Sequence, residues 1–217
     1  MWPPRTLVIT SRARVGGDAS ALIAFVAAAA EAGVDAVQVR ERDWDDRQLL
    51  HVVRAIGDAV RHTGCRVLVN ERAHVAWAAG AHGVHLRGNG MPALRVRAVQ
   101  PAGQGIGRSV HAGDAASAAA GCDYVLFGTV FPSVSKPDDA PVAGLEALAH
   151  WAGLAGAVPV LAVGGIEPAG CAAVRAAGAR GVAGIELFVS AYARGAAVLA
   201  AAVRDIHAVF GDGERAQ

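Results

Sequence analysis

Short runs of apolar, mostly β-branched residues recur along the chain, separated by longer stretches rich in alanine and charged residues. Each run is bounded by glycine, proline or polar residues, which is typical of a strand buried on both faces of a parallel sheet. The pattern predicts eight strands, at Thr6–Thr10, Ala36–Arg40, Arg66–Asn70, Gly83–Leu86, Gly105–Ser109, Tyr124–Phe127, Pro159–Val163 and Gly181–Ile185.

The stretches between the strands predict helices, and the first of them ends at Gly33, a residue that commonly stops a helix. The predicted helices are Ala19–Glu31, Asp45–His62, Ala73–Ala79, Pro92–Val99, Gly113–Ala120, Leu145–Ala152, Cys171–Ala177 and Ala196–Phe210. Regular alternation of strand and helix implies a parallel sheet with right-handed crossovers. Eight such units most simply close into an α/β fold of the (β/α)8 TIM-barrel type, with an open doubly wound sheet as the alternative.

The chain has 217 residues, and 53% of them are hydrophobic. This length matches one α/β barrel and is sufficient to bury a large core. We find no linker, low-complexity stretch or second set of elements, so we expect a single domain over residues 1–217. Residues 211–217, which follow the last predicted helix, are expected to fray.

Charge and cysteine content narrow the class of function. The formal net charge is +1, which argues against nucleic acid or an anionic membrane as the main partner. The three cysteines have no metal-type spacing and fit reduced thiols in the cytoplasm. The N-terminus has no signal-peptide pattern, and the apolar stretch Ala21–Ala30 is too short to span a bilayer. We therefore expect a cytoplasmic protein that acts on small molecules; a homodimer is compatible with the sequence, which does not fix the oligomeric state.

Polar and cationic side chains follow the predicted strands at their carboxyl ends. In a parallel barrel these ends meet at one rim, where ligand sites are built. The second strand delivers Gln38, Arg40 and Arg42 in alternation, so that all three share one face. The other strand ends add Asn70, Glu71, His85, Arg87, Arg108, Ser109, His111, Ser133, Ser135, Lys136, Gly164 and Gly165.

Several of these groups suit a phosphate ligand. Ser133 and Ser135 offer hydroxyl donors and Lys136 a point charge. Gly164 and Gly165 allow backbone amides to approach an anion just before a helix. Taken alone, the serines and Lys136 would also fit a solvated proline–serine turn, and the two glycines would fit an ordinary tight turn. Their combination with arginines from other strands favours a site for a phosphorylated small molecule.

The same residues lie in motifs that occur in this order and spacing in one known family. The motifs are VQVRERD (Val37–Asp43), VNER (Val69–Arg72), GVHL (Gly83–Leu86), IGRSVH (Ile106–His111), DYVLFGTVFPSVSK (Asp123–Lys136) and VGGI (Val163–Ile166). On these motifs the chain resembles the thiamine-phosphate synthase and thiazole tautomerase family, and the resemblance covers nearly the whole chain.

Resemblance to the synthase branch implies a transferase of thiamine biosynthesis, which couples hydroxymethylpyrimidine diphosphate to thiazole phosphate and releases diphosphate. In that reaction the pyrimidine leaves as a carbocation-like species, so fixed cations stabilise the charge that develops on the leaving group. The resemblance assigns Ser109 to the pyrimidine, and Arg40, Ser109 and Lys136 are the expected catalytic residues. It assigns the diphosphate to Gln38, Arg40, Arg42, Asn70 and Lys136, and the thiazole phosphate to Ser133, Ser135, Gly164 and Gly165.

Two places depart from the synthase pattern. Synthases carry an aspartate after the third-strand asparagine and a second acid after the fourth strand, which together hold Mg²⁺; this chain has Glu71 and Gly90 there. We expect Glu71 to be a metal ligand and Mg²⁺ to bind weakly or be dispensable. We expect Arg87 or Arg108 to supply part of the missing positive charge; the alternative is that Arg87 is solvated at the surface. Glu186 replaces a serine near the thiazole phosphate, and its carboxylate repels a phosphate unless a cation intervenes.

Two other functions stay open on the sequence. The tautomerase branch, an isomerase of thiazole carboxylate phosphate, needs proton-transfer groups; His111 is its catalytic candidate and His85 a second, although a barrel histidine is also a common structural residue. Against that branch, Thr129 stands where the tautomerase has a histidine. The third reading is a non-catalytic barrel that binds thiazole phosphate, suggested by the incomplete metal pair and by Glu186.

Overall fold

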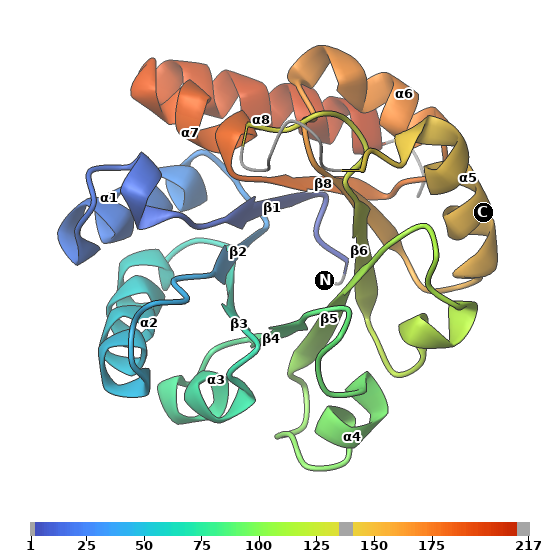
Figure 1. Ribbon diagram of the computed structural model, residues 1–217. Helices are drawn as coiled ribbons and strands as arrows, with labels where there is room; N and C mark the ends of the chain where they lie inside the picture. The colour runs from blue at the N-terminus through green and yellow to red at the C-terminus, as the bar shows by residue number, and fades with distance from the viewer. Residues whose placement is uncertain (1–2, 135–140, 212–217) are drawn as a thin grey trace.

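Eight parallel strands form a closed barrel in the order of the sequence, in a computed structural model that describes residues 3–134 and 141–211 (Figure 1). Each strand pairs with the next along the chain, and β8 pairs with β1. The strands are β1 (Thr6–Ile9), β2 (Ala36–Val39), β3 (Arg66–Asn70), β4 (Gly83–Leu86), β5 (Gly105–Val110), β6 (Tyr124–Gly128), β7 (Val160–Val163) and β8 (Gly181–Gly184).

Helices surround this barrel on its outer side (Figure 1). In the part of the chain that the structure describes, none of them is both long and apolar enough to cross a bilayer. The α-helices are α1 (Ala19–Glu31), α2 (Asp46–Val60), α3 (Ala73–Ala79), α4 (Ala93–Arg97), α5 (Gly144–Leu154), α6 (Cys171–Ala176), α7 (Glu186–Ala193) and α8 (Ala196–Phe210), and the 3₁₀ helices are η1 (Arg12–Arg14), η2 (Ala116–Ala119) and η3 (Pro168–Gly170).

The predicted TIM barrel is confirmed, and closure of the sheet excludes the open doubly wound alternative. Every predicted strand is present, with ends that differ by at most one residue from the prediction. Helix ends follow the expected chemistry: Asp45 accepts a hydrogen bond from the Gln48 amide at 2.7 Å, and the Gln48 side chain accepts one from the Asp45 amide. This reciprocal capping satisfies amides that would otherwise lack partners at the start of α2.

Two predicted segments differ from the observed elements. Residues 113–120 were expected to be helical, but only Ala116–Ala119 form a 3₁₀ turn, because the Asp114 carboxylate instead accepts from the His111 amide and closes a local turn. The chain after β8 was expected to stay extended to Ile185, whereas Ile185 caps α7. The sequence pattern did not predict α7, because its β-branched and aromatic residues are weak helix formers.

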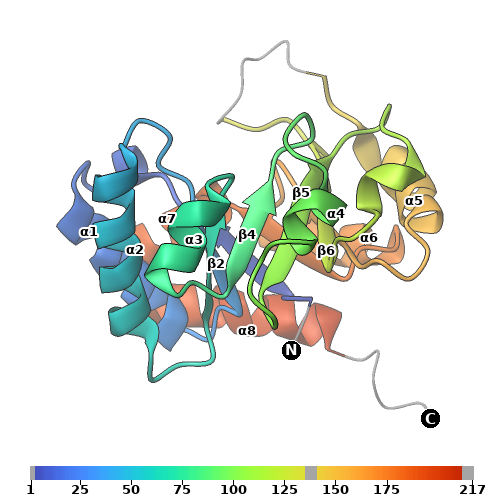
Figure 2. The same ribbon diagram turned by 90° about the horizontal axis from the view of Figure 1, so that it is seen from below.

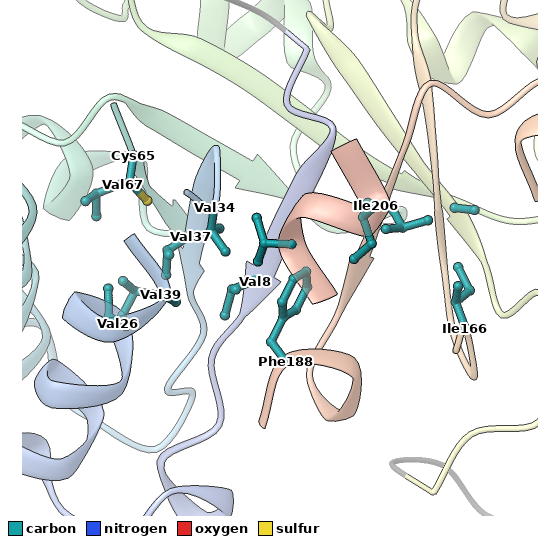
Figure 3. Packing of buried hydrophobic residues seen from close by; sticks show 14 of the residues in the cluster. Val8, Val26, Val34, Val37, Val39, Cys65, Val67, Ile166, Phe188 and Ile206 are labelled. Atoms are coloured by element: carbon teal, nitrogen blue, oxygen red, sulfur yellow. The ribbon is translucent and has the colours of Figure 1, made fainter. Parts of the chain in front are cut away.

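Alternate residues of each strand face two different apolar layers. The barrel interior holds Leu7, Ile9, Ala36, Leu68, Tyr124, Leu126, Leu161 and Ala183. The outer layer lies between the strands and the helices, and Figure 3 shows Val8 of β1 between Val37 of β2 and Phe188 of α7. Because Ala36 faces the interior, Gln38 faces it too, and the polar strand ends therefore converge at one rim.

Candidate active site

A cavity of about 630 Å³ opens at the carboxyl ends of the strands. Figure 2 shows the barrel from the side, with the arrow of β4 pointing toward this rim. The predicted site residues that line the cavity are Gln38, Arg40, Arg42, Asn70, Ser109, His111, Ser133, Gly164 and Gly165. Ser135 and Lys136 lie outside the described residues, so their predicted roles stay predictions.

The β2–β3 side of the cavity carries a buried amide pair. The Gln38 side chain is 2% exposed and donates from Nε2 to Oδ1 of Asn70 at 3.0 Å. Its other polar atom, Oε1, is buried and has no hydrogen-bond partner among the described residues. A buried acceptor without a partner is costly, so this atom favours a ligand that brings a donor such as an amino group.

Arg40 and Arg42 add two guanidinium groups to the same side. Neither guanidinium group forms a hydrogen bond or ion pair with another described residue, although both side chains line the cavity. Burial, and then the like charge of Arg42, lower the pKa of Arg40. Two neighbouring cations that are not neutralised in the free protein favour the binding of an anion, which relieves their repulsion.

Ser109 is held in the cavity by a chain of buried hydrogen bonds. Its Oγ lies 2.9 Å from His85 Nε2, and His85 Nδ1 lies 3.0 Å from the Tyr124 hydroxyl. The Tyr124 ring fits inside the barrel because Gly107 faces it; a Cβ at Gly107 would overlap the ring. Burial, helped by the charge of Arg40, lowers the pKa of His85 to about 3, so the imidazole is neutral at physiological pH.

His111 occupies the rim rather than the interior. Its side chain is 59% exposed, and Nδ1 lies 3.3 Å from the Asp114 carboxylate. A general base acts best when it is held against the reacting group and shielded from water. The exposure of His111 therefore gives no support to its predicted catalytic role, which stays a prediction.

The opposite side of the cavity is the turn after β7. Gly164 and Gly165 have φ values of 102° and 60°, in the left-handed region that side chains disfavour. A Cβ at Gly165 would overlap the carbonyl oxygen of Pro132, and one at Gly164 would overlap the buried Thr129 side chain. The two glycines thus let this turn pack against the chain that follows β6.

Glu186 begins α7 at the same end of the cavity. Its Oε1 accepts from the Ser190 hydroxyl at 2.5 Å, and its Oε2 lies 3.5 Å from Nη1 of Arg14. The cation that faces Glu186 is therefore Arg14 of η1. Because this ion pair is long and both side chains are partly exposed, Arg14 reduces the negative charge of Glu186 at this end of the cavity but does not remove it.

Some lining residues were missed by the sequence interpretation. They come from η1 and α7, two short helices that it did not predict, and they are Arg14, Ser190 and Arg194. Arg14 had a signal, since it follows the first strand within the cationic run Ser11–Arg14. Ser190 and Arg194 had none, because they enter the cavity through the fold of α7 and its C-terminal residue.

The predicted metal ligand Glu71 faces a second, smaller cavity of about 210 Å³, which Arg42, Asn70 and Arg87 also line. Arg87 donates from its amide and from Nε to the Glu71 carboxylate, at 2.5 and 2.8 Å. Arg108 points elsewhere: its guanidinium donates to the carbonyls of Gly88 and Met91, and it lines neither cavity. Of the two arginines considered from the sequence, Arg87 is the one at the site.

Comparisons with known proteins agree with this arrangement. A family model for thiamine monophosphate synthase matches residues 6–188. A putative thiamine-phosphate synthase of Geobacter sulfurreducens is 40% identical over 185 residues, which cover 84% of this chain and 85% of that protein. A thiamine-phosphate synthase of Laribacter hongkongensis is 38% identical over 198 residues and 90% of each chain.

Comparison with solved structures points to the same family. The solved structure of a thiamine phosphate pyrophosphorylase from Pyrococcus furiosus superposes with a TM-score of 0.77, at 27% identity and 96% coverage of both chains. The resemblance stated from the motifs is thereby confirmed. The chain belongs to the thiamine monophosphate synthase family.

Proposed function

We propose that the protein is a thiamine-phosphate synthase, a transferase that joins hydroxymethylpyrimidine diphosphate to thiazole phosphate and releases diphosphate. The observation that carries the proposal is the cavity itself. It brings Arg40, Arg42, Ser109 and the Gly164–Gly165 turn to one rim, in a chain that belongs to the thiamine monophosphate synthase family. A cavity of about 630 Å³ is within the range that encloses small-molecule ligands.

The β2–β5 side of the cavity suits the pyrimidine diphosphate. Arg40 and Arg42 offer guanidinium donors that match phosphate oxygens, and the orphan Oε1 of Gln38 accepts from an amino group. When His85 carries its proton on Nε2, it donates to Oγ of Ser109 and leaves the Ser109 hydroxyl proton free for the substrate. His85 is thus a positioning residue, while Arg40, Arg42, Gln38 and Ser109 contact the substrate.

The β6–β8 side suits the thiazole phosphate. Glycines in the turn after β7 allow main-chain amides to approach an anion, and the loops after the seventh and eighth strands are a frequent phosphate site in this fold. Ser133 lies on the same side and adds a hydroxyl group. The proposed function also includes the predicted roles of Ser135 toward the thiazole phosphate and of Lys136 toward the diphosphate.

In the reaction, the bond between the pyrimidine methylene carbon and the diphosphate oxygen breaks, and its electron pair goes to the diphosphate. The thiazole nitrogen then donates its lone pair to the methylene carbon and forms the new C–N bond. Arg40 and Arg42 stabilise the charge that grows on the leaving diphosphate, because both guanidinium groups line the cavity that receives it. Bond exchange needs no proton transfer, which agrees with the neutral His85 and the exposed His111.

The tautomerase alternative receives less support. That reaction moves a proton, yet Thr129, which stands where the tautomerase branch has a histidine, is 6% exposed and packs against Gly164. Threonine is a poor base at neutral pH. The relatives compared above carry the synthase name, and none of them is described as a tautomerase.

An end-point assay separates the three functions considered for this barrel. Purified protein is incubated with both substrates, with and without Mg²⁺, and thiamine phosphate is quantified. Formation of thiamine phosphate supports the synthase. Isomerisation of thiazole carboxylate phosphate alone would select the tautomerase. Calorimetric binding of thiazole phosphate without turnover of either substrate would select the non-catalytic binder.

The partners proposed here are phosphorylated small molecules. A cytoplasmic location accompanies the proposal, supported by three cysteines that are all free thiols, as in a reducing compartment. A homodimer is compatible with the sequence, and the oligomeric state stays open.

A further inference from the structure

The β2–β4 side of the rim brings two arginines close to the Glu71 carboxylate. Arg42, Asn70, Glu71 and Arg87 line the smaller cavity, and Arg42 and Arg87 also line the larger one. We propose that this site binds diphosphate through the guanidinium groups of Arg40, Arg42 and Arg87 without a resident Mg²⁺, and that Glu71 holds Arg87 rather than a metal ion. The identity of the anion as a diphosphate rests on the proposed function.

The geometry of Glu71 supports a role as an anchor. Its carboxylate receives the Arg87 amide on Oε1 at 2.5 Å and the Arg87 Nε on Oε2 at 2.8 Å, so both oxygens are engaged. Glu71 has a φ of 64°, the left-handed value that a residue with a side chain adopts at some cost. That backbone conformation, together with 21% exposure of the side chain, keeps the carboxylate under Arg87.

A side chain at residue 90 would displace the Glu71 carboxylate from its present position under Arg87. At Gly90 a Cβ would lie 2.8 Å from Oε1 of Glu71 and 3.2 Å from the Arg87 carbonyl oxygen. The other acid lining the smaller cavity, Glu41, is buried and accepts from the Thr10 hydroxyl at 2.7 Å and from the Arg12 amide. Among the residues that the structure describes, no three His, Cys, Asp or Glu side chains cluster as metal ligands.

Mg²⁺ requires several oxygen ligands in a near-octahedral arrangement, of which the protein usually supplies one or two carboxylates. Here the Glu71 carboxylate is bound to the Arg87 guanidinium group. The Glu41 carboxylate is bound to the Thr10 hydroxyl and to the Arg12 guanidinium group. The donor set therefore does not fit a resident Mg²⁺. The rim offers guanidinium groups instead, and these neutralise phosphate directly.

Arg87 is suited to that task. Glu71 uses its Nε, which leaves the two terminal nitrogens without a hydrogen bond to any described residue. The side chain is 54% exposed, so an anion can reach these nitrogens while Nε stays anchored. Planar guanidinium groups bind phosphate oxygens in pairs, and three of them around one rim can surround a diphosphate.

Isothermal titration calorimetry with inorganic diphosphate tests the proposal without turnover. Wild-type protein is titrated in EDTA and again with excess Mg²⁺; we expect the two dissociation constants to agree within about threefold. In EDTA, Arg87→Ala is expected to weaken binding by about tenfold or more, the usual effect of losing a charge-assisted hydrogen bond. Arg95→Ala, an exposed arginine of α4, is the matched control and is expected to leave binding unchanged.

A second pair of variants guards against a folding defect. Arg87→Lys keeps the charge but loses the planar fork, and it is expected to bind diphosphate with intermediate affinity. The double variant R87G/G90D removes the guanidinium and adds a carboxylate beside Glu71, so its binding of diphosphate is expected to depend on Mg²⁺. Thermal unfolding of each variant shows whether the fold is kept.

The proposal is overturned if wild-type protein binds diphosphate only when Mg²⁺ is added, or if Arg87→Ala binds it as well as wild type in EDTA. Failure of the proposed function gives a different signature. In that case thiamine phosphate would not form with or without Mg²⁺, while diphosphate binding in EDTA and its loss in Arg87→Ala would persist.

Discussion

Individual side chains at the cavity owe their positions to partners one layer deeper in the barrel. Ser109 is the clearest example, since it contacts His85, which in turn contacts the Tyr124 hydroxyl. Tyr124 itself depends on the missing side chain of Gly107. The Ser109 hydroxyl, which we propose contacts the substrate, is therefore held by residues deeper in the barrel, as a preorganised site requires.

Changing Tyr124 to phenylalanine tests this hydrogen-bond chain. The ring still fills the space over Gly107, but His85 Nδ1 loses its buried partner. We expect Tyr124→Phe to lower the free energy of unfolding by about 1–3 kcal/mol, measured by urea denaturation. Tyr192→Phe is the control, because the Tyr192 hydroxyl has no hydrogen bond to a described residue. Equal stability of Tyr124→Phe and wild type would show that the hydroxyl contributes nothing.

Glu186 sets the charge at the other end of the cavity. In Glu186→Gln the amide can still accept from Ser190, but the negative charge on the side of the cavity proposed for the thiazole phosphate is gone. We expect the KM for thiazole phosphate to fall by about threefold, a small effect because the carboxylate is half exposed and Arg14 already faces it. The KM for the pyrimidine diphosphate should stay constant, and Glu31→Gln, at the exposed end of α1, serves as the control. A higher or unchanged KM for thiazole phosphate would contradict the repulsion.

Among the elements, the turn after β7 depends most on its residue types. Gly165 has a φ of 60° and faces the Pro132 carbonyl, so both conformation and space exclude a side chain. We expect Gly165→Ala to destabilise the fold by about 2 kcal/mol or more, measured by urea denaturation.

Gly57 of α2 provides the matched control for this turn. It lies in a helix, and a Cβ there would meet no atom within 4 Å. Gly57→Ala is therefore expected to stabilise the protein by about 0.5–1 kcal/mol, since alanine loses less backbone freedom in a helix. If Gly165→Ala and Gly57→Ala change the free energy of unfolding by similar amounts, the turn after β7 does not require glycine at position 165.

On the scale of the whole molecule, Asp35 ties together parts of the chain that are far apart in sequence. Its carboxylate accepts from the amides of Arg5 and Thr6 at 2.8 and 2.9 Å, and lies 3.1 Å from His207 Nε2 on α8. Burial opposes ionisation of Asp35, but the bonds from His207 and Thr6 outweigh it and lower the pKa below the usual 3.8. The contact joins the start of β1 to the last helix.

This contact predicts a pH dependence of stability. Because the folded-state pKa of Asp35 is lower than its unfolded value, its contribution is complete above about pH 3.8 and is lost as the pH falls through the folded pKa. We expect Asp35→Asn to be less stable than wild type at neutral pH, with a difference that shrinks toward about pH 3. Urea denaturation across this range measures it, with Asp58→Asn on the exposed face of α2 as the control. A difference that does not vary with pH would contradict the assignment.

Local pattern was enough to predict the barrel, since each strand and most helices are short, periodic units whose ends are marked by glycine or acidic caps. It was also enough to predict that Gln38, Arg40, Arg42, Asn70 and Ser109 meet, because the carboxyl ends of parallel strands share one rim. It failed at α7, where Phe188, Val189 and Tyr192 are weak helix formers, and where Phe188 and Val189 stabilise the helix by packing in the core.

The sequence by itself determined the alternation of strands and helices and the residue types at the strand ends, because alternation and spacing are local properties of the chain. It favoured a closed barrel, and the structure excluded the open sheet. Only the tertiary structure decided which arginines line the cavity. Arg87 and Arg108 look alike in sequence, yet one is anchored by Glu71 beside the cavity and the other bonds the carbonyls of Gly88 and Met91. That choice depends on partners supplied by neighbouring strands and loops, which meet only when the barrel closes.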